Sequence, residues 1–142
     1  MARRLFLLLT FIFLTSGCYS LSEDAYFPTE YQETYTRVVT CQQTGHPSGG
    51  YQETWVSPEA LTADDVQEGT VIMKVQWDTD SNCTIGSEDM TTVMRRTADG
   101  QGHDGGNWEW QVIGGLGDLV DNNASSCTAC HASCQGELCS HW

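Results

Sequence analysis

Residues 70–77, TVIMKVQW, constrain the fold of this 142-residue chain more than any other segment. Apolar side chains stand at every second position, at Val71, Met73, Val75 and Trp77. Because successive side chains of a strand point to opposite faces of a sheet, this alternation predicts a strand with one apolar face. Lys74, the only lysine of the chain, is then expected on the other face, beside Ile72 and Gln76.

Three further segments have the composition of strands. Residues 51–56 (YQETWV), 90–97 (MTTVMRRT) and 107–113 (NWEWQVI) are rich in aromatic and β-branched residues. In the last of these, apolar side chains alternate at Trp108, Trp110 and Val112. About four strands are therefore expected.

Two segments predict short helices. Residues 28–39 have a Pro-led start and helically spaced aromatic residues. Residues 57–65 begin with Ser57 in the N-cap position and Pro58 in the first helical position. Residues 114–126 are expected to form a loop. The predicted fold class is α+β, mainly antiparallel β-sheet with short helices.

The first 17 residues have the pattern of a secretory signal. Arg3 and Arg4 precede an apolar run at 5–14, which is too short to span a membrane. Small residues then lead to Cys18 in LTSGC, which is similar to the cleavage site of bacterial lipoproteins. We expect residues 1–17 to be removed and Cys18 to carry a lipid anchor. Ordinary signal cleavage near Cys18 is the alternative.

The rest of the chain is strongly acidic. Without the two arginines of the signal, four basic residues face 19 acidic ones, a formal net charge of −15. Proteins bind nucleic acid by neutralising phosphates with Lys and Arg, so nucleic acid is excluded as a partner. The acidity indicates a well-solvated surface.

A Cys-x-x-Cys-His sequence lies near the end of the chain. In CTACH, Cys127 and Cys130 can both reach one edge of a porphyrin, and His131 can bind its iron. A zinc site would need a second ligand pair at a suitable spacing, and a thioredoxin-like site would need a βαβ context. Disulfide bonding of these two cysteines would leave His131 unexplained. The pattern therefore predicts one covalently attached haem c, held by a C-terminal segment.

Four other cysteines remain, which are Cys41, Cys83, Cys134 and Cys139. In an exported chain they are candidates for two disulfides, and sequence leaves all three pairings open. A bond from Cys134 to Cys139, or to a cysteine on a strand, is slightly favoured.

Residues 100–105, GQGHDG, match Gly-x-Gly-x-x-Gly literally. A dinucleotide site needs a strand before this pattern and a helix after it, whereas a strand-like segment follows here. The segment is predicted to be a hairpin loop. His103 in this loop and His141 in the tail are expected to be solvated.

The strand EGTVIMKVQW, the following segment TTVMRRTADGQGHDGGNWEWQV and the late CTACHASC together resemble the cytochrome P-460 family, which includes the c′-beta cytochromes. The resemblance covers residues from about Tyr51 to Cys134. It divides the chain into a signal at 1–17, a tether and helix at 18–50, and a haem domain at 51–142.

The resemblance implies a five-coordinate haem iron with His131 as proximal ligand and an open site for hydroxylamine or nitric oxide. Hydroxylamine-oxidising members cross-link a strand lysine to the porphyrin, and Lys74 matches that position. Their distal arginine falls near Gln52, where this chain has none, which puts hydroxylamine oxidation in doubt. Glu53 is adjacent and is a candidate proton-transferring carboxylate, although alternation places it opposite Gln52.

Other functions stay open beside a haem oxidoreductase. One is a simple electron-transfer cytochrome lipoprotein with a sixth ligand, for which Met73, Met90 and Met94 are available. Another is a disulfide-stapled lipoprotein without haem. Expected partners are a small nitrogen compound, a redox protein, a membrane reached through the anchor, and a second copy of the chain. The expected location is the bacterial periplasm or the outer membrane.

Overall fold

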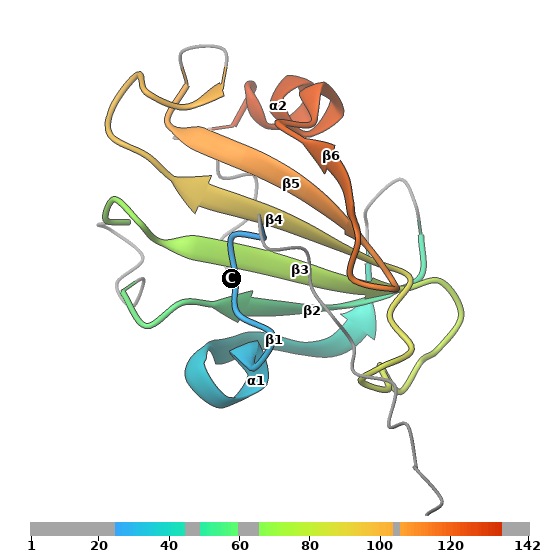
Figure 1. Cartoon of the computed structure of the whole chain (residues 1–142). Helices are drawn as coiled ribbons and strands as arrows, with labels where there is room; N and C mark the ends of the chain where they lie inside the picture. Colours follow the sequence, from blue (N-terminus) through green and yellow to red (C-terminus); the bar gives the residue numbers. More distant parts are fainter. Residues whose placement is uncertain (1–24, 45–48, 60–65, 104–105, 135–142) are drawn as a thin grey trace, which may run out of the picture.

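The computed structural model describes residues 25–44, 49–59, 66–103 and 106–134. Within these residues, six strands form one antiparallel sheet in the order of the sequence, β1-β2-β3-β4-β5-β6 (Figure 1). The strands are β1 (Thr36–Gln43), β2 (Tyr51–Val56), β3 (Val71–Trp77), β4 (Met90–Arg96), β5 (Trp108–Gly114) and β6 (Leu119–Asn122). Two short helices flank them, α1 (Tyr31–Thr34) and α2 (Ser125–His131).

The mainly antiparallel sheet and its four expected strands are confirmed, as β2, β3, β4 and β5. The predicted helix at 28–39 is wrong beyond its first part, because only Tyr31–Thr34 is helical and β1 follows. The two β-branched valines of this segment favour a strand, and β1 pairs with β2. The expected domain boundary at Tyr51 therefore falls between two paired strands.

The predicted loop at 114–126 is also partly wrong. It contains β6 and the first two residues of α2. β6 has an almost fully exposed side-chain pattern, so it lacks the apolar alternation from which strands are recognised. β6 is a strand because its backbone pairs with that of β5. The helix expected at 57–65 lies mostly outside the described residues, and Ser57 accepts a hydrogen bond from the Val71 N–H.

The sheet separates two apolar clusters. One face, here called the α1 face, carries Val71, Met73, Val75 and Trp77, packed with Phe27, Tyr31 and Trp55. The other, here called the α2 face, carries Val56, Ile72, Met94, Trp108 and Trp110, against which Cys127 of α2 packs. The alternation predicted for β3 is thus confirmed, and Lys74 falls on the α2 face with Ile72.

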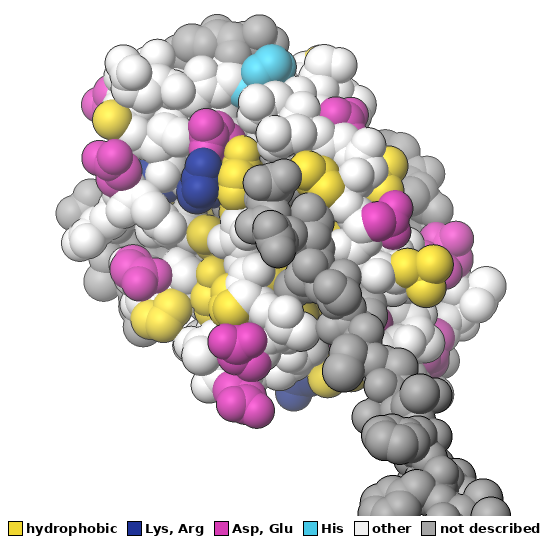
Figure 2. All heavy atoms as spheres, in the orientation of Figure 1, with side chains coloured by type: hydrophobic (Ala, Val, Ile, Leu, Met, Phe, Trp, Pro, Cys, Tyr) yellow, Lys and Arg dark blue, Asp and Glu magenta, His cyan; other side chains and the backbone are white. Residues whose placement is uncertain are grey.

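The N-terminal described segment is fastened to the α1 face. The Tyr26 N–H donates to the Gln111 side chain at 2.9 Å, and Arg95 lies 3.8 Å from the centre of the Tyr26 ring. Arg95 also pairs with Glu109 on the neighbouring strand. Acidic side chains are spread over the face visible in Figure 2, with few basic ones between them. None of the helices in the described ranges is long and apolar enough to cross a bilayer.

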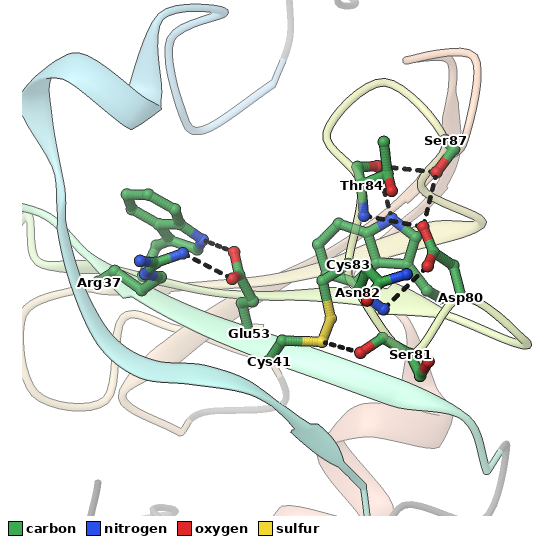
Figure 3. Close-up of a disulfide and its surroundings, with 11 residues drawn as sticks. Arg37, Cys41, Glu53, Asp80, Ser81, Asn82, Cys83, Thr84 and Ser87 are labelled. Carbon is green, nitrogen blue, oxygen red and sulfur yellow. Dashed lines mark hydrogen bonds and ion pairs between the residues drawn. A yellow bond between two sulfur atoms is a disulfide. The ribbon is translucent and has the colours of Figure 1, made fainter.

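One disulfide joins the edge strand to the β3–β4 loop on the α1 face. Cys41 and Cys83 are bonded, with their Cα atoms 5.8 Å apart (Figure 3). Asp80 orders the same loop by accepting the backbone N–H groups of Asn82 and Thr84, each at 2.9 Å. The sequence left three disulfide pairings of four cysteines open, and the structure contains the bond between Cys41 and Cys83. Cys134 is disulfide-bonded too, and its partner lies outside the described residues.

Candidate haem-binding site

α2 brings the three residues of the Cys-x-x-Cys-His sequence onto one short helix. Cys127 and Cys130 lie three residues apart, about one helical turn, and His131 is the last residue of the helix. Neither cysteine is in a disulfide, so both keep their thiols. Cys127 is half-buried against the α2 face, while Cys130 is exposed.

The pKa of the Cys127 thiol is raised because burial disfavours the thiolate. The neighbouring Asp121 and Cys130 add to this effect, while a hydrogen bond with Ser126 opposes it. The Cys127 side chain therefore lies in a partly apolar environment, in contact with the sheet.

His131 is held against the sheet by an aromatic contact. The centroids of the His131 and Trp110 rings are 4.6 Å apart, and the ring planes are tilted by 57°. Trp110 is only 4% exposed. The sequence singled out Trp110 as an alternating strand residue, but it gave no signal that this indole meets the histidine of the Cys-x-x-Cys-His sequence.

Lys74 lies on the same face as these groups. In the register of the sheet it is opposite Thr54 on β2 and Thr92 on β4. Its pKa is lowered, chiefly because burial disfavours the ammonium form, and the Cys130 thiolate opposes that shift. The tertiary structure thus brings together Lys74 and Cys130, which are 56 positions apart in the sequence.

Glu53 does not join this group. It is 3% exposed on the α1 face, opposite Val75 of β3. Its carboxylate accepts hydrogen bonds from Arg37 Nη1 at 2.8 Å and from the Trp55 indole N–H at 3.1 Å (Figure 3). The candidate proton-transferring role is therefore not supported by its position, because the sheet separates it from Lys74.

The remaining candidates fall in different places. His103 lies between the antiparallel strands β4 and β5, so the predicted loop is confirmed for its described part, residues 100–103. Met90 and Met94 face the α2 side, whereas Met73 is fully buried in the cluster of the α1 face. Cys18, Cys139 and His141 lie outside the described residues.

The donor set fits a haem. Two thiols and an imidazole from one helix are the groups that attach a c-type haem and bind its iron. Between them, the Thr128 hydroxyl oxygen is buried and has no hydrogen-bond partner within the described ranges. A buried polar group of this kind ordinarily has a partner, and a ligand bound here can supply one. No other described segment offers this combination.

A single antiparallel sheet followed by a helix that carries the Cys-x-x-Cys-His sequence is the arrangement of a β-sheet cytochrome, unlike the small helical c cytochromes. Residues 28–137 match the sequence model of the family described as Cytochrome P460. The match covers most of the chain, so the chain belongs to the cytochrome P460 family. Haem is therefore its cofactor, and the resemblance seen in the sequence is confirmed. Comparison with curated proteins found no match.

Proposed function

We propose that this chain is an exported monohaem c-type protein that binds or oxidises a small nitrogen compound, such as hydroxylamine or nitric oxide. Cys127 and Cys130 form the thioether bonds, and His131 is the proximal ligand. The observation that supports this best is the meeting of α2 with Lys74 on one face of the sheet. In this family that helix and that lysine are the haem-linked elements, as the resemblance implies.

Haem bound by Cys127, Cys130 and His131 would supply an iron able to bind a small ligand. Beside Lys74, the neighbouring strands supply uncharged polar groups. Thr54 and Thr92 flank Lys74 across the sheet, and the Gln76 amide donates to the Thr92 hydroxyl at 3.4 Å. Uncharged polar neighbours suit a small neutral ligand, because they solvate it without demanding a counter-charge.

Lys74 is the chain's candidate for proton transfer and for the cross-link. Its lowered pKa increases the share of neutral amine, which is both a proton acceptor and a nucleophile. It makes no ion pair with a described residue. An amine with no fixed carboxylate partner stays available to a ligand or to a porphyrin edge.

A second candidate function is plain electron transfer through a six-coordinate iron. It is favoured by Met94, which is buried on the α2 face directly opposite Trp110, the residue that contacts His131. The ferrous absorption spectrum separates the two functions. Sharp six-coordinate bands would support electron transfer, and a red-shifted five-coordinate Soret band would support ligand chemistry.

Export and membrane anchoring form part of the same proposal. Haem attachment of this kind takes place outside the cytoplasm, and the Cys-containing leader is of lipoprotein type. The mature protein is expected to begin at Cys18 and to partition into detergent, whereas Cys18→Ser is soluble or unprocessed. A mature N-terminus beyond Cys18 would exclude the anchor.

The deciding experiment is expression together with a c-type haem maturation system. Haem should remain on the denatured protein, and Cys127→Ala with Cys130→Ala should abolish it. His131→Ala should keep the thioether bonds and change the spectrum at once. Haem staining that survives the double substitution would overturn the attachment sites. Native protein without covalent haem would overturn the proposal.

A further inference from the structure

We propose that Trp110 is a positioning residue for His131, which fixes the orientation of the imidazole and thereby its bond to the iron. This inference rests on the proposed role of His131 as proximal ligand. Trp110 is not expected to touch the reacting ligand, and it acts through the histidine alone.

The ring contact is the first observation. At 4.6 Å between centroids and a tilt of 57°, the two rings lie within the range in which aromatic pairs attract each other. The imidazole therefore meets a rigid neighbour on one side. A histidine ring usually has its orientation fixed by such surrounding groups, and the orientation decides how well a ring nitrogen points at a metal.

The second observation is that α2 has little support of its own. It is seven residues long, and isolated helices of that length are not stable in water. Its N-cap is Ala124, which offers no side chain to the first N–H groups. Contacts outside the helix must therefore hold it in place.

Trp110 provides such contacts at both ends of α2. Its backbone carbonyl accepts a hydrogen bond from the N–H of Asn123, the residue before the N-cap Ala124. Asn123 has φ 60°, a left-handed conformation that turns the chain from β6 into α2. At the far end, the Trp110 indole meets His131. One strand residue thus fixes both where the helix starts and where its histidine lies.

Trp110 itself is firmly held. It is buried, and it lies opposite Met94 in the register of β4 and β5. Met94 is in turn opposite Ile72 on β3, and Ile72 is opposite Val56 on β2. All four side chains belong to the apolar cluster of the α2 face. The imidazole is therefore braced against the core of the sheet.

Resonance Raman spectroscopy of the loaded ferrous protein tests this inference, because the iron–imidazole stretching band reports the orientation and strength of that bond. Trp110→Leu should displace or split the band while haem stays covalently attached. Trp110→Phe, which keeps a flat ring, should restore a band close to the native one. Trp110→Met also lacks a flat ring, and its flexible side chain adapts to an irregular space better than leucine, so it replaces the Leu variant if the cavity prevents folding.

Trp108→Leu is the matched control. It removes an equally buried indole two residues away on the same face, so it should lower stability and leave the band unchanged. A native band in Trp110→Leu, or an equal displacement of the band in both Leu variants, would overturn the positioning role of Trp110. The proposed function would stand. Absence of covalent haem from the unaltered protein, or an unchanged spectrum in His131→Ala, would overturn the proposed function and this inference with it.

Discussion

Lys74 on β3 and Cys130 on α2 interact electrostatically, although burial of the lysine has the larger effect on its pKa. Burial lowers this pKa because the ammonium form loses water, and the nearby thiolate raises it again in part. The relationship connects β3 in the sheet with α2, the helix that carries the Cys-x-x-Cys-His sequence. The titration of Lys74 should therefore report on changes in that helix.

The stability of the haem-free protein should depend on pH through Lys74. Because the pKa of Lys74 is lower in the folded state, the unfolded state binds more protons between the two values. Lys74 therefore costs stability below its folded pKa, and this cost disappears as the pH rises to the ordinary value of 10.5.

Lys74→Met should thus raise the urea midpoint at pH 7, with a gain that shrinks toward pH 10.5. Cys130→Ala should lower the pKa of Lys74 further, since it removes the opposing charge. A gain from Lys74→Met that is the same at both pH values would show that the lysine is solvated.

The thiols of Cys127 and Cys130, which we propose attach the haem, should differ in reactivity before haem is bound. Cys127 is half-buried and has a raised pKa, whereas Cys130 is exposed. Since the thiolate is the nucleophile, Cys127 should react severalfold more slowly with iodoacetamide at neutral pH. Mass spectrometry of a time course gives both rates. In denaturant the two rates should become similar, and a native ratio near one would contradict the packing of Cys127.

Glu53 should prove structural. Glu53→Ala leaves the buried Trp55 indole N–H without its acceptor, which should lower the free energy of unfolding by about 2 kcal/mol. Arg37→Gln should cost about 3 kcal/mol, because it leaves the buried Glu53 carboxylate without its counter-charge. Chemical denaturation measures both. Neither change should alter the haem spectrum, and a spectral change in Glu53→Ala would restore the catalytic interpretation.

The Cys41–Cys83 disulfide should stabilise the domain without serving the site. It closes a loop with a sequence separation of 42 residues, for which chain entropy gives about 4 kcal/mol. Replacing both cysteines by Ala should remove stability of that order and keep covalent haem, because the bond lies on the α1 face. Loss of haem attachment at temperatures where the variant is folded would contradict this separation of roles.

The sequence by itself determined the features that depend on local pattern. The alternation in 70–77 predicted which face of β3 carries Lys74, because the two-residue period of a strand is a property of the backbone. The spacing of Cys127, Cys130 and His131 likewise indicated a haem protein, because it is set by the chemistry of attachment.

Only the tertiary structure decided which distant residues meet. β1 was mistaken for a helix and β6 for a loop, since each is an edge strand with a largely exposed pattern and depends on pairing with its neighbour. The meeting of Trp110 with His131, of Lys74 with Cys130, and of Cys41 with Cys83 follows from how the sheet and helix pack. Such contacts join residues far apart in the chain, so the local sequence around one residue does not indicate which residue it contacts.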